Sequence, residues 1–254
     1  MISGSLPYAE KIGEFFYEGL GRQTSVCLFG SAATGNWVPG RSDLDLVIFV
    51  PEEHLEQLGR KIRAWVWSSA PTYPILDGYA LAISRDRCSI WRLDEFARVT
   101  FPSNSTIDLV DQWMIKYRSK HLFGSVSIPT LFPDISQSEL RAWASEELMS
   151  LLASNPQGNV PAPAVVLSKL IWSVSWAARM LMLLKGSVCE SKREALQWLA
   201  REYVETRNLV CLLLDNYLMS DEIALSITSE QSQFLCRFCL EKLRQESKSE
   251  RAIE

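Results

Sequence analysis

Two aspartates and a glycine-serine pair, separated by a short connection, are the residues of this sequence best suited to chemistry. Gly30-Ser31 follows a short apolar run, and Asp43 and Asp45 open a second one that continues to residue 50. Side chains alternate across a β-strand, so the two aspartates are predicted to point to the same side with their carboxylates several ångströms apart. Two like charges held together are costly unless a cation lies between them. Oxygen ligands of this kind favour Mg²⁺, which proteins often share with substrate phosphates.

The glycine-serine pair supplies the complementary half of such a site. A glycine at position 30 lets the backbone come close to a ligand, and the amides around Ser31 can donate hydrogen bonds to phosphate oxygens. A donor loop and paired aspartates together indicate a site for a nucleoside triphosphate and a metal. The alternative is a Gly-Ser turn followed by two solvent-facing aspartates at a strand start. The joint pattern GS…SDLDLVIFV, with strand context on both sides, favours the nucleotide site over that alternative.

Apolar periodicity predicts the elements that position these residues. In the first half the patterns predict two helices and three strands, at residues 8–21 (helix), 25–29 (strand), 43–50 (strand), 52–69 (helix) and 74–84 (strand). A segment with two prolines and no helical period, 125–137, is predicted to be a linker. Beyond it the patterns are helical throughout, at residues 138–153, 163–185, 191–218 and 220–244. The sequence therefore predicts an α/β domain at residues 1–128 followed by an all-helical domain at residues 137–254.

Composition narrows the class of protein. The chain has 254 residues with 47% hydrophobic and 22% charged side chains, which excludes a mostly disordered chain. A net charge of −4 argues against a protein that mainly binds nucleic acid through phosphates. The apolar stretch 165–184 contains Lys169 and Arg179 and is predicted to be a buried helix, so no membrane partner is expected. The N-terminus has no pattern of a secretory signal, and the six cysteines are expected to be reduced, which predicts a cytoplasmic protein.

The order of motifs resembles the polymerase-β-type nucleotidyltransferases, and among them the streptomycin/spectinomycin adenylyltransferases. The resemblance rests on FGSA at residues 29–32, SDLDLVIFV at 42–50, a third strand, and a helical C-terminal half. It implies an α+β protein in which a nucleotidyltransferase domain with a small mixed sheet precedes a helical bundle. It also implies that Asp43 and Asp45 bind Mg²⁺, and that Gly30, Ser31 and Ser42 contact the triphosphate of ATP.

A third acidic residue is implied on the next strand, where the family has a glutamate that is the proposed general base. Asp77 is the residue in that place, and it would take the proton of an attacking hydroxyl or bind a metal. Because aspartate is one methylene shorter than glutamate, we expect a metal-ligand or water-mediated role. Apart from the resemblance, Asp77-Gly78 between apolar residues is typical of a hairpin turn, and this alternative stays open.

The helical half offers a second set of family residues. The family has an arginine, a lysine thirteen residues later and a tyrosine about two dozen residues further on, all of which help to hold the triphosphate. Arg179, Lys192 and Tyr217 reproduce that spacing to within one residue. Because a triphosphate carries about four negative charges, cations are the expected partners. The alternative is that Arg179 and Lys192 are ordinary charges on helices.

The acceptor side departs from the family. The antibiotic enzymes have a tryptophan and two acidic residues ahead of the arginine, whereas no acidic residue lies between Gln157 and Cys189 here. Carboxylates are the expected partners for the ammonium groups of an aminoglycoside. Asp108, Asp111 and Trp113 lie where the family has another acidic and aromatic contribution to the pocket. We therefore predict that Asp108 and Trp113 bind the acceptor.

These observations predict an enzyme that transfers AMP from ATP to a hydroxyl of a small molecule, with Mg²⁺ as cofactor. The resemblance makes an aminoglycoside or aminocyclitol antibiotic the leading acceptor, and we expect a monomer. One alternative is a nucleotidyltransferase that acts on another metabolite or on a protein hydroxyl. Another is an ATP-binding regulator with weak catalysis, which the replacement of the family glutamate by Asp77 keeps open.

Overall fold

The computed structural model divides the chain into two compact units, Met1–Asp134 and Ile135–Glu254, which are described separately below. The residues that the structure describes are 6–21, 23–35, 43–68, 76–84, 88–93, 106–154, 164–187, 189, 191–218 and 227–251.

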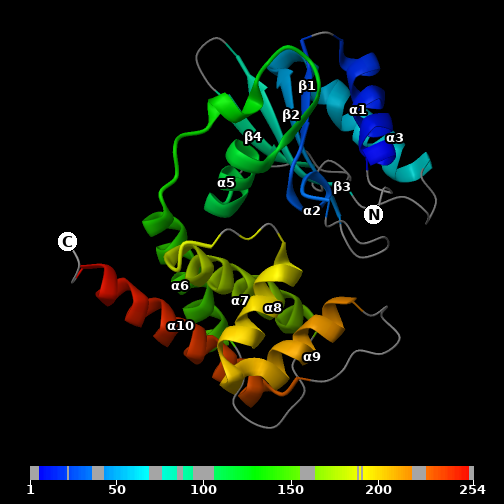
Figure 1. Cartoon of the computed structure of the whole chain (residues 1–254). Coiled ribbons are helices and arrows are strands. Elements are labelled where there is room, and N and C mark those ends of the chain that lie inside the picture. Colours follow the sequence, from blue (N-terminus) through cyan, green and yellow to red (C-terminus); the bar gives the residue numbers. More distant parts are fainter. Residues whose placement is uncertain are drawn as a thin grey trace. The chain divides into compact units, whose positions relative to one another are not determined.

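A mixed sheet forms the centre of the N-terminal unit (Figure 1). Within the described residues it has five strands in the order β4-β3-β2-β1-β5. Their bounds are β1 Ser25–Leu28, β2 Leu44–Pro51, β3 Leu76–Ile83, β4 Cys88–Arg92 and β5 Lys120–Phe123. Strands β2 and β3 are parallel, and the other neighbouring pairs are antiparallel. The predicted fold class, α+β with a small mixed sheet followed by a helical region, is confirmed.

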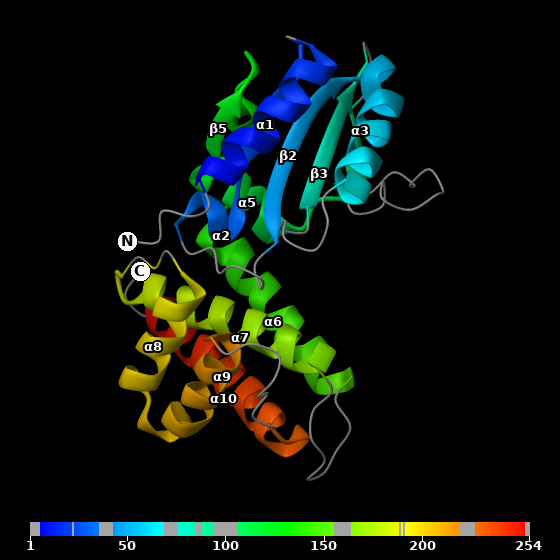
Figure 2. The ribbon, with the colours of Figure 1, turned by 90° about the vertical axis from the view of Figure 1, so that its right-hand side faces the viewer.

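Helices cover both faces of this sheet (Figure 2). On one face α1 (Leu6–Leu20) and α3 (Leu55–Ser68) pack against alternate residues of β1 and β2, which include Leu44 and Leu46. On the opposite face α5 (Leu109–Arg118) and the 3₁₀ turn η2 (Ile128–Leu131) pack against the intervening residues. Apolar residues on both sides are expected for a central strand such as β2. A second short 3₁₀ turn, η1 (Glu52–His54), leads from β2 into α3.

The C-terminal unit is helical throughout its described residues. Its helices are α6 (Gln137–Ser154), α7 (Ala164–Leu184), α8 (Lys192–Glu202), α9 (Arg207–Leu218) and α10 (Ser229–Arg251). Helix α7 packs against α6, α8 and α10, and α9 packs against α8. No helix in the described ranges has the length and apolar character needed to cross a membrane. Cys236 and Cys239, whose spacing could suit a metal, are both buried in α10.

Two helix boundaries differ from the predictions. The pattern at residues 191–218 predicts one helix, but α8 ends at Glu202 and the 3₁₀ turn η3 (Val204–Thr206) separates it from α9. The fully buried Thr206 stabilises this break, because its hydroxyl donates to the carbonyl of Tyr203 at 2.9 Å. Helix α10 begins at Ser229, whereas the pattern predicts a start near residue 220. Thr228 and Gln231 exchange the two hydrogen bonds of a capping box at the observed start.

Candidate active site

The backbone ladder brings the end of β1 beside the start of β2. Leu28 pairs with Leu46, and one step further the Phe29 amide donates to the carbonyl oxygen of Asp45 at 3.0 Å. The next residue, Gly30, begins the short helix α2 (Gly30–Ala33). The glycine-serine bend therefore follows directly from the pairing of the two strands that carry the motif.

Gly30 lies against the carboxylate of Asp45. It has a φ of +65°, a conformation that L side chains rarely adopt. A Cβ built on this glycine would overlap Oδ2 of Asp45. The absence of a side chain at position 30 thus makes room for the carboxylate, and Asp45 lies immediately next to the bend.

The structure describes two of the three remaining residues of the motif. Ser31 is half-buried in α2, and its carbonyl accepts a hydrogen bond from the Thr34 hydroxyl at 3.2 Å. Asp43 is exposed and immediately precedes β2, which begins at Leu44 rather than at Asp43 as the pattern predicts. Ser42 lies outside the described residues.

Asp77 lies on β3 in direct register with Asp45 on β2. Directly paired residues of neighbouring strands point to the same side of a sheet, so both carboxylates lie on the face that α5 covers. The hairpin-turn alternative for Asp77-Gly78 is wrong, because both residues lie inside β3. Gly78 has a φ of +110°, and a Cβ at this position would overlap the backbone carbonyl of Leu46.

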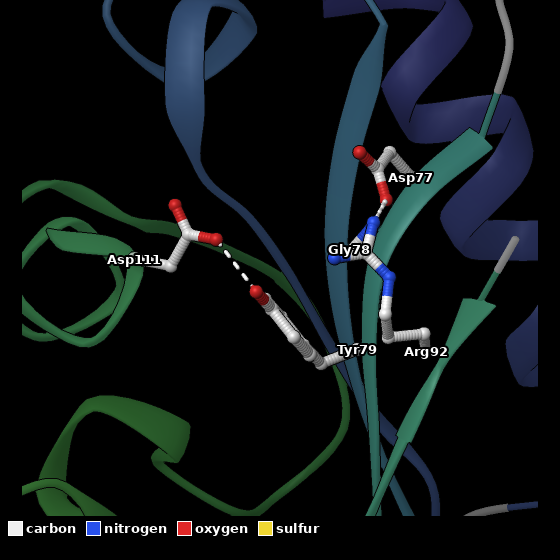
Figure 3. Close-up of polar contacts among 5 residues, drawn as sticks. All are labelled: Asp77, Gly78, Tyr79, Arg92 and Asp111. Atoms are coloured by element: carbon white, nitrogen blue, oxygen red, sulfur yellow. Dashed lines mark hydrogen bonds and ion pairs between the residues drawn. The ribbon is translucent and has the colours of Figure 1, made fainter. Parts of the chain in front are cut away.

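A chain of polar contacts joins Asp77 to α5 (Figure 3). Oδ1 of Asp77 accepts hydrogen bonds from the Gly78 amide at 2.7 Å and from Nη2 of Arg92 at 3.0 Å. The Arg92 guanidinium lies 5.9 Å from the centre of the Tyr79 ring. The Tyr79 hydroxyl donates to Oδ2 of Asp111 at 2.7 Å. Burial raises the pKa of Tyr79, and the nearby Asp111 charge raises it further, so this hydroxyl keeps its proton.

The two predicted acceptor residues have different surroundings. Asp108 is exposed and precedes the first turn of α5. Trp113 contacts its own helix, with Tyr117 at 5.7 Å between ring centres and the Arg118 guanidinium 5.7 Å from the indole. Asp111, one turn from Asp108, faces the sheet and accepts the Tyr79 hydrogen bond. The start of α5 therefore presents acidic groups on the same side of the sheet as Asp77.

In the helical unit, Arg179 and Lys192 flank the start of α8. The Arg179 guanidinium stacks 4.5 Å from the centre of the Trp176 ring. Burial raises the pKa of the neighbouring Cys189 thiol, and the Arg179 charge opposes this shift. The Cys189 thiol donates to the carbonyl of Ser191 at 3.1 Å. Ser191 caps α8 by accepting a hydrogen bond from the Glu194 amide, and Lys192 is the first residue of that helix. The backbone of the third predicted residue, Tyr217, belongs to α9, but its side chain lies outside what the structure describes.

Comparison with known proteins identifies the N-terminal pattern. Residues 10–76 match the family model described as nucleotidyltransferase domain, a range that includes the glycine-serine bend and both aspartates of the motif. This part of the chain therefore has the sequence pattern of nucleotidyltransferase domains. No curated protein matches the chain closely enough to count as a relative. The match to the nucleotidyltransferase domain supports the prediction that the protein is an enzyme.

A solved structure shares its fold with most of the chain. It is the crystal structure of spectinomycin adenyltransferase AAD(9) from Enterococcus faecialis with ATP and spectinomycin. The two chains are 17% identical with a TM-score of 0.63, and the match covers 94% of this chain and 99% of that one. The resemblance inferred from the motifs is thereby confirmed, with a nucleotidyltransferase domain followed by a helical region in the same fold.

The acidic groups of the nucleotidyltransferase domain fit a metal that is shared with substrate. Among the described residues, no three histidine, cysteine, aspartate or glutamate side chains converge closely enough to enclose an ion by themselves. Mg²⁺ usually binds one or two carboxylates together with substrate phosphates and water. Asp45 beside the Gly30 bend, with Asp43 two residues earlier, matches that incomplete type of site.

Sequence reasoning missed Tyr79 and Arg92, two residues of the polar chain on the sheet. Strand β4, which carries Arg92, was not predicted at all, because its five residues include a charge and lack a clear alternation. Pairing of Tyr79 with Arg92 across β3 and β4 is a long-range contact that no local pattern reveals. The sequence did offer one indication of Tyr79. Side chains alternate along a strand, so Tyr79 lies on the same face of β3 as Asp77.

We expect Gly30→Ala to lower nucleotidyl transfer by about hundredfold, since misplacing a catalytic group by about 1 Å can cost that much. The added methyl would displace the Asp45 carboxylate. Gly35→Ala is the matched control, because Gly35 has a φ of +77° and no atom within 4 Å of a built Cβ. Rates of pyrophosphate release check the prediction, and equal losses in the two variants would contradict it.

The buried carboxyl of Asp111 should make stability depend on pH. Burial raises its pKa from 3.8 to about 6, the Tyr79 hydroxyl opposes this shift, and the charges of Asp108 and Asp77 add to it. The folded state therefore binds this proton more tightly than the unfolded chain. The resulting stabilisation is complete below about pH 4 and is lost as the pH rises through about 6.

Asp111→Asn removes this titration. We expect its free energy of unfolding, relative to the unsubstituted protein, to rise by about 2.4 kcal/mol between about pH 4 and pH 7, because each pKa unit corresponds to about 1.4 kcal/mol and the unfolded chain is already partly ionised at pH 4. Urea unfolding of both proteins at the two pH values measures the difference. A difference that does not change with pH would show that the Asp111 carboxyl is not perturbed.

Proposed function

We propose that the protein is a Mg²⁺-dependent adenylyltransferase that moves AMP from ATP to a hydroxyl group of a small molecule. The observation that supports this most directly is the Asp45 carboxylate, which lies against the Gly30 bend and level with Asp77 on the next strand. The nucleotidyltransferase domain match includes this bend and Asp45. The structure of similar fold was solved with ATP and spectinomycin, which supports ATP and a small acceptor as the two substrates.

The reaction forms one bond and breaks one. The acceptor oxygen bonds to the α-phosphorus of ATP, the bond between that phosphorus and the bridging oxygen breaks, and pyrophosphate leaves. The acceptor hydroxyl loses its proton, and Asp77 is the group that we propose to receive it, directly or through a water molecule. Bound Mg²⁺ would neutralise charge on the phosphates. Asp43 and Asp45 would hold it, and Asp77 would be the third ligand where it does not act as the base.

We further propose that Gly30, Ser31 and Ser42 contact the triphosphate and that Arg179, Lys192 and Tyr217 contribute to phosphate binding. Positive side chains at the start of a helix oppose its dipole, and this cost is removed when an anion binds there. Lys192 is the first residue of α8, and the Arg179 guanidinium of α7 lies next to Cys189, which shortly precedes that helix. The local structure of the helical unit therefore supports a phosphate-binding role for these two cations.

As acceptor we propose an aminoglycoside or aminocyclitol, with Asp108 and Trp113 among the groups that bind it. Asp108 is exposed and lies one helical turn from Asp111, so ammonium groups could find carboxylate partners at the start of α5. The absence of acidic residues between Gln157 and Cys189 favours a less cationic acceptor or another metabolite as the second candidate.

Pyrophosphate release with ATP, Mg²⁺ and a panel of spectinomycin, streptomycin and related compounds tests the proposal. We expect release that depends on both Mg²⁺ and one of the acceptors, with an adenylylated acceptor detected by mass spectrometry. Thermal stabilisation by ATP and Mg²⁺ without turnover on any acceptor would instead support a nucleotide-binding regulator. If the protein shows neither thermal stabilisation by ATP and Mg²⁺ nor turnover on any acceptor, the nucleotide site itself is contradicted.

A further inference from the structure

The two carboxylate oxygens of Asp77 have different environments. Oδ1 accepts two hydrogen bonds, from the Gly78 amide and from Arg92, whereas no described residue donates to Oδ2. The side chain is about one-third exposed, so the carboxylate group is not sealed from solvent. One oxygen of Asp77 therefore anchors the carboxylate, and the other is available for chemistry.

Arg92 reaches Asp77 from the neighbouring strand. Arg92 pairs with Tyr79 across β3 and β4. Its guanidinium extends along the same face of the sheet to the carboxylate of Asp77, two residues before Tyr79 (Figure 3). The Arg92 side chain is 35% exposed and that of Asp77 33% exposed. Ion pairs with this much exposure contribute little to folding, since water screens them and two side chains must be ordered. A contribution to folding stability therefore does not explain the ion pair between Arg92 and Asp77.

The Tyr79 ring beneath Arg92 is held on both sides. It is almost fully buried, and it stacks on Phe29 with ring centres 6.3 Å apart and planes 25° apart. Its hydroxyl is fixed by the hydrogen bond to Asp111. Phe29 directly precedes Gly30, so the same ring contacts the residue that leads into the glycine-serine bend. Arg92 thus lies on a rigid surface that is part of the site.

We propose that Arg92 is a positioning residue that holds Oδ1 of Asp77 and directs Oδ2 toward the acceptor hydroxyl. The inference rests on the proposed function, in which Asp77 receives the acceptor proton. A short carboxylate on a strand has two side-chain torsions to fix, and Gly78 alone supplies one hydrogen bond to it. The guanidinium supplies a second donor from another strand, which locks the orientation of the carboxylate plane.

Steady-state kinetics of Arg92→Gln test this role. We expect kcat for adenylyl transfer to fall by about tenfold to hundredfold, because a misdirected general base loses part of its contribution to the rate. KM for ATP should stay within about twofold. Arg60→Gln is the matched control, since Arg60 forms an exposed ion pair with Glu56 at 3.3 Å on α3. Its kinetics should match those of the unsubstituted protein. Added methylguanidinium should restore part of the activity of Arg92→Ala but not that of Asp77→Asn.

A double-mutant cycle separates positioning from a structural effect. If Arg92 acts through Asp77, the variant with both Asp77→Asn and Arg92→Gln should be no slower than Asp77→Asn alone. Multiplied losses in the double variant, or near-normal kcat in Arg92→Gln, would overturn the inference while leaving the proposed function intact. Near-normal transfer by Asp77→Asn would instead contradict the role of Asp77 in the proposed function.

Discussion

Asp45→Asn should lower the rate of AMP transfer by about hundredfold or more, which corresponds to about 2.7 kcal/mol of lost transition-state stabilisation. Asparagine has nearly the same volume as aspartate, so the packing against Gly30 is preserved while the negative charge is lost. A neutral amide is a poor ligand for Mg²⁺, and the phosphates would then keep their repulsion toward an incoming oxygen. The expected signature is a loss of turnover in a protein that unfolds at an unchanged temperature.

Asp215→Asn is the matched control for this prediction, because Asp215 is an exposed carboxylate on α9. Its rate should equal that of the unsubstituted protein. Titration with Mg²⁺ at saturating ATP adds a second readout, since Asp45→Asn should require a higher Mg²⁺ concentration for half-maximal residual activity. Near-normal transfer by Asp45→Asn would show that this carboxylate does not hold the metal.

Gly78→Ala should destabilise the N-terminal unit by about 3 kcal/mol or more, since it combines a strained backbone conformation with overlap of buried atoms. Gly78 has a φ of +110°, and the added methyl would overlap the Leu46 carbonyl on the neighbouring strand. The overlapping atom belongs to the backbone of a central strand, so it cannot move without disturbing the pairing of β2 and β3.

Gly21→Ala separates the two contributions. Gly21 has a φ of +81°, but no atom lies within 4 Å of a built Cβ, so this variant reports the conformational strain alone. We expect it to lose about 1 kcal/mol, the cost of a left-handed conformation for an L residue. Urea unfolding of both variants measures the difference. Similar losses would mean that β2 and β3 are further apart at Gly78 than the structure indicates.

The part of the site that lies close together in the sequence could be predicted, because local rules decide it. A buried strand that ends in Gly-Ser and a second strand that begins after Asp-x-Asp bring Gly30 and Asp45 together once the strands pair. The parallel strand β3, and with it the position of Asp77, also follows from the apolar pattern and the family resemblance. The Asp-Gly turn signal was misleading here, because Gly78 serves a close approach between two strands rather than a reversal of the chain.

The rest depended on contacts that no local pattern encodes. Arg92 becomes part of the site through the pairing of β3 with β4, and Asp111 through the packing of α5 on the sheet. The break between α8 and α9 contains neither glycine nor proline, and the buried Thr206 decides it through its hydrogen bond to Tyr203. Tertiary packing prevailed over local propensity at that point.

The parallel pairing of β2 and β3 limits which insertions and deletions the site can tolerate. Hydrogen bonds between the strands set the alignment of Asp45 with Asp77. Deleting a single residue within β3 would therefore turn every following side chain to the opposite face. Natural variation in length and engineered insertions should accordingly accumulate outside these two strands. A reporter peptide is therefore best introduced at a position outside β2 and β3.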